Sequence, residues 1–182
     1  MPYVYSPFTS SVWNLDCYCN PVNGGCGACG QYGLHCAISG WGAPVDIGAS
    51  PNAQIWCYMD STIQSVSLSI HQSNFCNCGN SDYNNYVVVD LWSGQGAGGS
   101  HLGSVLYLHV SGPQSGTWNA PNPIYGESFW QALIGNVPGG QTCNPCYYNA
   151  HSHMQCAGGS RQVNSCGQGV TGGGGGTVVY AF

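Results

Sequence analysis

Apolar and polar residues alternate in several short segments of the chain, and turn-forming residues separate these segments. Alternation at period two is typical of β-strands that bury one face. The clearest strand is residues 86–92, an apolar run that predicts a buried strand, and residues 104–110 follow as the next one. Further extended or strand segments are expected at residues 2–13, 54–58, 63–70, 151–156 and 177–182, whereas residues 129–137 fit either a strand or a short helix.

Clusters of Gly, Pro, Asn and Cys lie between these segments and predict loops. The loops are expected at residues 16–33, 75–85, 112–127 and 139–149, with a turn at 94–99. No amphipathic helix of useful length is apparent. We therefore expect an all-β fold of antiparallel sheets, loop-rich, with one domain over residues 1–166. A glycine-rich arm and a terminal strand, residues 167–182, follow it.

Charged residues make up only 4% of the 182 residues, and Arg161 is the single Lys or Arg. Disorder is not expected, because 43% of the residues are hydrophobic. The net charge of −5 argues against nucleic acid or an anionic membrane as a partner, since a binding surface would need cations to neutralise phosphates. No apolar run reaches the roughly 18 residues that a membrane-spanning helix requires.

The chain contains 12 cysteines, an even and dense set. Such a set is typical of disulfide-stapled proteins in an oxidising compartment, so an extracellular or secreted location is expected; the interior of a hyperthermophile is the alternative. The Cys26-x-x-Cys29 and Cys143-x-x-Cys146 pairs also have the spacing of a zinc knuckle. They are more than a hundred residues apart, and disulfides are therefore the favoured interpretation, with the pairing open.

Candidate chemistry centres on His151-Ser152-His153. Histidines at i and i+2 of a strand project to the same face, so both imidazoles can enter one site. An isolated His-x-His is more often a polar pair on a strand face. Upstream, however, the chain supplies Asp46 and His109, which taken singly could be a capping loop residue and a core histidine.

In this order the parts resemble the lysostaphin-type zinc endopeptidases, which cut peptide cross-links in bacterial cell walls. The resemblance covers most of the chain. Its elements are Ser6-Pro7-Phe8, Val45-Asp46-Ile47-Gly48-Ala49-Ser50-Pro51 with Ile55-Trp56-Cys57, Asn85-Tyr86-Val87-Val88-Val89-Asp90, Leu106-Tyr107-Leu108-His109-Val110-Ser111, and Ile134-Gly135-Asn136-Val137 with His151-Ser152-His153.

The resemblance implies a lysostaphin-like peptidase domain that hydrolyses a peptide or peptidoglycan substrate with Zn. Asp46 and His153 would be metal ligands, and His109 and His151 would flank the zinc-bound water as general base and transition-state stabiliser. These residue types suit hydrolysis, because a catalytic zinc takes three N or O ligands and keeps one position open for water.

One departure affects the metal site. The family places its first zinc histidine four residues before the aspartate, and this chain has Gly42 there. His35, eleven residues before Asp46, is the nearest replacement and would require the residues between to form an inserted loop. The other interpretation is that the ligand is lost. His71 and His101 are further histidines, expected on surface loops.

A second functional class stays open. Scarce charge, abundant glycine and tyrosine, and dense cysteines also suit a degenerate lysostaphin-like fold used as the structural subunit of an extracellular filament or sheath. In that hypothesis residues 177–182 add as a β-strand to a neighbouring copy, with the glycines before them as a connecting arm. The alternative is that the strand pairs within its own domain.

Overall fold

The computed structural model describes residues 1–10, 12–13, 26–28, 34–36, 38–74, 81–121, 128–139, 150–163 and 169–182. At positions 13, 26–28, 34–36, 43, 81 and 169 the description is of the backbone alone. The described regular structure is strand, apart from two short 3₁₀ turns, Ser81–Asn84 and Gln95–Ala97. Within these residues no helix is long and apolar enough to cross a membrane.

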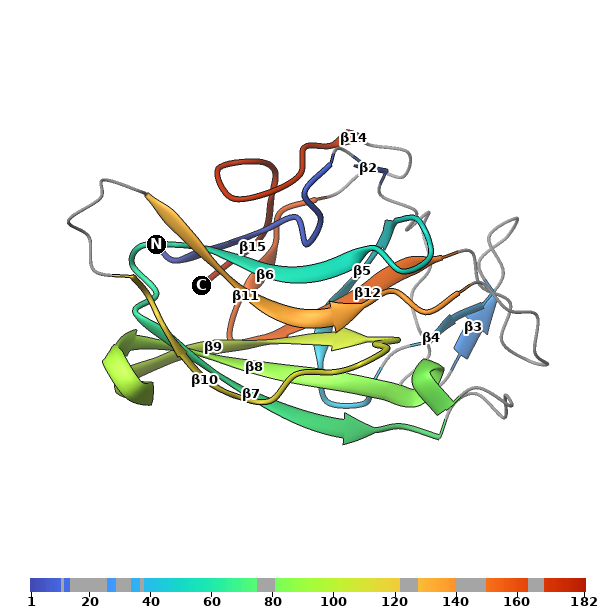
Figure 1. Cartoon of the computed structure of the whole chain (residues 1–182), viewed down its shortest axis with the longest axis horizontal. Coiled ribbons are helices and arrows are strands. Elements are labelled where there is room, and N and C mark those ends of the chain that lie inside the picture. The colour runs from blue at the N-terminus through green and yellow to red at the C-terminus, as the bar shows by residue number, and fades with distance from the viewer. Residues whose placement is uncertain are drawn as a thin grey trace.

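Two antiparallel sheets form the body of the molecule (Figure 1). The larger sheet has the order β10-β7-β8-β9-β12-β5, with bounds Gly116–Asn119, Ser65–Gln72, Asn85–Gly94, Gly98–Leu108, His151–Ala157 and Gly42–Gly48. The smaller has the order β11-β6-β1-β15-β13, with bounds Phe129–Asn136, Gln54–Asp60, Tyr3–Tyr5, Val178–Ala181 and Ser160–Arg161. Two ribbons complete the fold, β14 (Gly169–Val170) with β2 (Val12–Trp13) and β3 (Cys26–Ala28) with β4 (Leu34–Cys36).

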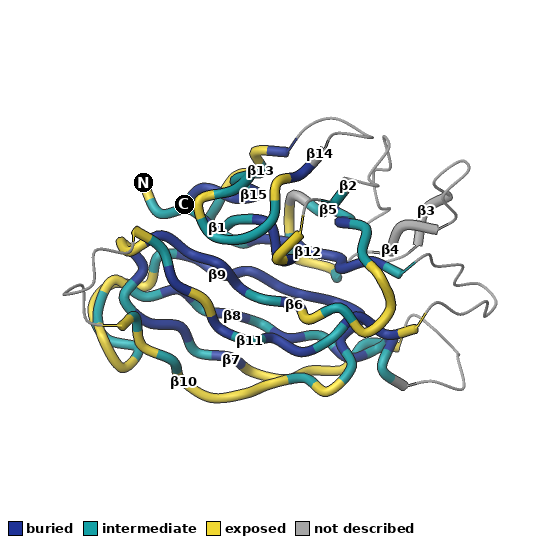
Figure 2. The backbone as a smooth tube through the Cα atoms, turned by 45° about the horizontal axis from the view of Figure 1, so that its top comes forward, coloured by how far each residue is buried: buried dark blue, intermediate teal, exposed yellow. Residues whose placement is uncertain are grey.

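Alternation along each strand decides which face is buried. In β8 the buried positions alternate with half-buried ones, and Val87, Val89 and Leu91 are fully buried. They join residues of the other sheet, such as Cys57 and Met59, in one apolar cluster. Figure 2 shows long buried stretches in β9 and β12 beside the alternating pattern of β8. The core is therefore the layer between the two sheets, and the outer face of the larger sheet remains available for polar groups.

The all-β prediction is confirmed. Strands predicted at residues 54–58, 63–70, 86–92 and 151–156 are present with ends shifted by no more than two residues. Residues 129–136 form strand β11 rather than a helix. Strand β9 begins earlier than predicted, at Gly98. β5 and β10 were not predicted as strands, since glycine and Pro44 interrupt their patterns. Both lie at the edges of the larger sheet, where proline is tolerated.

The C-terminal strand pairs within its own chain, which was the alternative to strand donation. β15 pairs with β1 on one side and with β13 on the other, all within the chain. Val179 and Tyr180 are fully buried in the core. Because both of its edges carry hydrogen bonds already, β15 has no free edge to offer a neighbouring copy.

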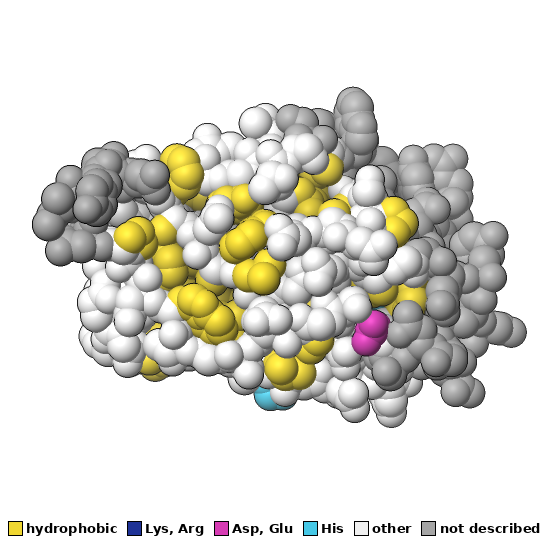
Figure 3. All heavy atoms as spheres, viewed as in Figure 1, with side chains coloured by type: hydrophobic (Ala, Val, Ile, Leu, Met, Phe, Trp, Pro, Cys, Tyr) yellow, Lys and Arg dark blue, Asp and Glu magenta, His cyan; other side chains and the backbone are white. Residues whose placement is uncertain are grey.

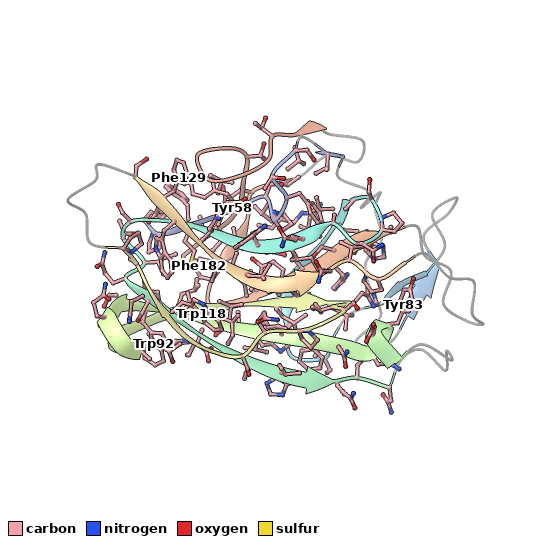
Figure 4. The ribbon with its side chains drawn as sticks, viewed as in Figure 1. Tyr58, Tyr83, Trp92, Trp118, Phe129 and Phe182 are labelled. Atoms are coloured by element: carbon pink, nitrogen blue, oxygen red, sulfur yellow. The ribbon has the colours of Figure 1, made fainter. Side chains whose placement is uncertain are left out.

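The run Gly172–Gly176 precedes β15 and packs closely against other segments. A Cβ added at Gly174 would overlap the Phe129 ring, which Figure 4 labels, and Gly173 has a positive φ of 77°. Glycine is needed at such positions because no other residue allows this approach or tolerates this backbone conformation so well. The run therefore acts as a packed connection rather than a free arm.

Replacing Gly174 should test this packing. We expect Gly174→Ala to lower the free energy of unfolding by about 1–3 kcal/mol, because the new methyl group must displace the Phe129 ring. Gly139→Ala is the matched control, since a Cβ there meets no atom within 4 Å. Urea unfolding of both variants measures the difference. Equal stability of the two variants would contradict the close packing.

Candidate functional site

Asp46, His151 and His153 lie on the two neighbouring strands β5 and β12. These strands are antiparallel, and their register places His153 directly opposite Asp46. Residues paired across strands share one face of the sheet, and His151 joins them because it lies two residues away along β12. Val45, Ile47 and Met154 point the other way, into the core. The three polar side chains therefore gather on the outer face of the larger sheet.

His109 completes the cluster from a third segment, immediately after β9. β9 is the other neighbour of β12, and Leu108 lies opposite His153. The His109 ring is edge-on to His151, with centroids 5.2 Å apart, and its centroid is 6.2 Å from that of His153. Four residues from three widely separated segments of the sequence thus meet at one place.

The closest contact in the cluster is between His153 Nδ1 and Asp46 Oδ1, at 2.7 Å. His151 Nε2 lies 3.8 Å from the same oxygen. The three histidines are 1–6% exposed, and the Asp46 side chain is 16% exposed. The neighbouring histidines stabilise the Asp46 carboxylate, because burial of a carboxylate without partners would cost several kcal/mol.

The backbone holds His109 in an uncommon conformation. Its φ is +62°, which few residues other than glycine adopt, and such strain is often found at functional sites. Its Nδ1 lies 2.6 Å from the carbonyl oxygen of Tyr83. A carbonyl can only accept, so Nδ1 carries the proton of this hydrogen bond. In the neutral ring Nε2 therefore carries none.

Burial is the main reason that the pKa of His109 lies well below its usual value, and the neighbouring His151 and His153 lower it further. The hydrogen bond to Tyr83 and the Asp46 carboxylate oppose this shift. The ring is therefore neutral near pH 7, with an Nε2 that can accept a proton. A general base must be unprotonated in this way, although the lowered pKa also makes this ring a weak base.

Gln155 is a fifth member of the cluster that the sequence analysis missed. It is fully buried, two residues beyond His153 on β12, and its Oε1 lies 3.3 Å from His153 Nε2. Its amide also bonds to the backbone at Ile38 and Trp41. Its position two residues after His153 could have predicted that it lies on the same face of the strand. The carbonyl of Tyr83 had no signal in the sequence, since any residue type supplies one.

The remaining candidate residues lie elsewhere or outside the described side chains. His71 lies at the exposed end of β7 and stacks on Tyr86. His101 lies on β9 and contacts Trp92 and Asp90 of the neighbouring strand β8. Both therefore lie on strands rather than on the expected loops. His35 lies in β4 opposite Gly27, and its side chain is outside the description. Gly42 begins β5 and pairs with Cys156, four residues along from Asp46, with no donor atom in its side chain.

Positive charge is scarce around the site. Arg161, the single Lys or Arg of the chain, donates a 2.7 Å hydrogen bond to the carbonyl of Pro44. On the face seen in Figure 3, hydrophobic side chains form yellow patches, and no Lys or Arg is visible among the described side chains. Among the described side chains, no group of three or more His, Cys, Asp or Glu residues is arranged to hold a metal ion.

Comparison of the chain with known protein families, curated proteins and solved structures gave no match.

The lowered pKa of His109 predicts a specific pH dependence of stability. Between the ordinary histidine pKa near 6.5 and the lower pKa in the fold, the unfolded chain binds more protons than the folded one. Stability due to neutral His109 is therefore full above about pH 6.5 and falls as the pH is lowered, by at most about 1.4 kcal/mol per pH unit.

We expect His109→Asn to flatten this dependence between pH 7.5 and 5.5 in urea unfolding. Asparagine suits the test because it tolerates a positive φ. His71→Gln, at an exposed position, is the control and should leave the slope unchanged. An unchanged slope in His109→Asn would show that His109 is not the buried neutral group.

Proposed function

We propose that the protein is a zinc-dependent hydrolase of peptide bonds, similar to lysostaphin-type endopeptidases and acting on cell-wall-type peptides. The observation that supports this most is the convergence of Asp46, His109, His151 and His153 on one face of the larger sheet. These are the residues that the resemblance assigned to the metal and to the catalytic histidines, and they come from β5, from β12 and from the turn after β9.

Asp46 and His153 are the two described side chains that we propose as zinc ligands. Asp46 Oδ1 and His153 Nδ1 face one another at 2.7 Å, and carboxylate oxygen and imidazole nitrogen are usual zinc ligands. When bound, zinc supplies an activated water near neutral pH and polarises the peptide carbonyl. Two protein ligands hold zinc weakly, so the proposal requires a third.

We assign the third ligand to His35. Its strand β4 ends two residues before Ile38, and the Ile38 N–H bonds to Gln155 beside His153. Three residues of extended chain span at most about 10 Å, so His35 is tethered close to the cluster. The β3–β4 hairpin also lies at the same end of the sandwich as Tyr83, the partner of His109 (Figures 1 and 4).

The other two histidines have roles suited to their environments. His109 is neutral and has an unprotonated Nε2, so it can take the proton of the attacking water. His151 lies between His109 and Asp46, where an N–H can stabilise the negative charge that develops on the peptide oxygen. Hydrolysis needs both roles, because the water must lose a proton as the carbonyl oxygen gains charge.

Metal binding and turnover should respond differently to substitutions in the cluster. The wild-type protein should bind about one zinc ion per chain, and His153→Ala should lose both zinc and hydrolysis of peptidoglycan-derived peptides. His109→Ala should keep zinc and lose about 10²–10⁴-fold in rate, as expected for loss of a general base. Elemental analysis after dialysis, together with peptide cleavage assays, measures both quantities.

His71→Ala is the control and should change neither quantity, and His35→Ala reports on the third ligand. A wild-type protein that binds no zinc would contradict the proposal. Zinc retained by His153→Ala would place the metal elsewhere.

Disulfide staples form part of the proposed extracellular enzyme. The described cysteine side chains are Cys57 and Cys156, which are buried and free. Burial raises the pKa of the Cys57 thiol to about 12, so it is an unreactive core residue. Cys26 and Cys36 lie directly opposite one another in the β3–β4 hairpin. Cysteines at directly opposed positions are close enough for a bridge, which here would brace the strand that carries His35.

We therefore expect a Cys26–Cys36 disulfide. Peptide mapping by mass spectrometry without reduction should find these two residues linked and should find Cys57 and Cys156 as free thiols. Alkylation of Cys26 and Cys36 in the unreduced protein, after unfolding, would exclude the bridge. Zinc bound by the Cys26–Cys29 and Cys143–Cys146 pairs would instead support the knuckle interpretation.

The structural-subunit hypothesis has lost the feature that supported it most. It depended on a C-terminal strand available to a second copy, and β15 is an interior strand of its own sheet. We therefore retain hydrolysis as the single proposed function.

A further inference from the structure

The amide of Gln155 has a defined orientation. The Ile38 N–H donates to Oε1 at 2.7 Å, and Nε2 donates to the carbonyl oxygens of Ile38 at 3.3 Å and Trp41 at 3.2 Å. Backbone N–H groups can only donate and carbonyl groups can only accept. Exchanging the amide oxygen and nitrogen would place like groups together at all three contacts, so the backbone of residues 38–41 fixes the side chain.

This orientation determines which nitrogen of His153 carries a proton. The atom of Gln155 that faces His153 Nε2, at 3.3 Å, is the oxygen Oε1. Because an amide oxygen can only accept, His153 must present an N–H at Nε2. Its other nitrogen, Nδ1, lies 2.7 Å from Asp46 Oδ1, which is also an acceptor.

One neutral imidazole has a single N–H and cannot satisfy two acceptors. With a single ring proton at Nε2, the lone pairs of Nδ1 and Asp46 Oδ1 face one another. This contact then needs either a second ring proton, as in an imidazolium, or a metal cation beside both atoms. Histidines that bind metals generally donate their second N–H to an oxygen acceptor, which fixes the ring and its tautomer. Gln155 stands where that acceptor is needed.

We propose that Gln155 is a positioning residue that holds the proton of His153 on Nε2 and thereby reserves Nδ1 for a zinc ion shared with Asp46. Its three other hydrogen bonds attach residues 38–41 to β12, so the same side chain holds the segment that follows His35 against the site. The part that concerns zinc depends on the proposed function. The part that concerns the tautomer does not.

Two variants separate the two roles of Gln155, as the acceptor for His153 Nε2–H and as the side chain that attaches residues 38–41 to β12. Gln155→Leu removes both. Gln155→Glu keeps an oxygen toward His153 Nε2 and toward the Ile38 N–H, but it cannot donate to the Ile38 and Trp41 carbonyls. Gln131→Leu, at an exposed position of β11, is the control for loss of a glutamine elsewhere.

The first readout is the tautomer of His153 in the metal-free protein, from ¹⁵N-histidine NMR. We expect a proton on Nε2 in the wild type and in Gln155→Glu, and its loss from Nε2 in Gln155→Leu, where Nδ1–H can donate to Asp46. An unprotonated Nε2 in the wild type would overturn the proposal, whether or not the protein binds zinc. If Gln155→Leu does not fold, the wild type and Gln155→Glu decide.

The second readout is zinc affinity by competition titration. We expect Gln155→Leu to bind zinc about 10–100-fold more weakly, the usual effect of losing such a partner, and Gln155→Glu and Gln131→Leu to stay within a few-fold of the wild type. Equal zinc affinity in Gln155→Leu and the wild type would overturn the zinc part. If the wild type binds no zinc but shows the expected tautomer, the proposed function is wrong. The role of Gln155 in fixing the proton of His153 on Nε2 would then still hold.

Discussion

The pairing of β12 with β5 is the constraint on which the candidate site depends. Its antiparallel register sets His153 opposite Asp46, while Met154 lies opposite Val45. Side chains alternate at period two, so a slip of one residue would move Asp46 into the core and bring Val45 or Ile47 to the outer face. Burial of Val45, Ile47 and Met154 therefore fixes the position of the polar cluster, and packing of the core decides the geometry of the site.

The cluster in turn depends on backbone groups that surround it. The carbonyl of Tyr83 holds the His109 ring, and the backbone of Ile38 and Trp41 holds Gln155. Each contact assigns a proton to a particular nitrogen, because backbone groups have fixed roles as donors or acceptors. These contacts leave Nε2 of a neutral His109 without a proton and hold Nδ1 of His153 beside Asp46 Oδ1.

Much of the fold could be predicted from the alternation of apolar residues, as in β8, whose ends shifted by only one or two positions. β5 could not, because Pro44 and two glycines hide the pattern of an edge strand. The order of Asp46, His109 and His153 predicted residues that do meet. The role of Gln155 could not be predicted, since it depends on a segment more than a hundred residues away. The left-handed conformation of His109 could not be predicted either, since it depends on the turn that follows β9.

A crystal structure of the zinc-soaked protein, with anomalous scattering measured at the zinc edge, would locate the metal in the proposed site. We expect one strong peak within coordination distance of both Asp46 Oδ1 and His153 Nδ1, with His35 as a third ligand and the Gln155 oxygen on the far side of the His153 ring. A peak at another site, or no peak beside an intact Asp46–His153 hydrogen bond, would contradict it.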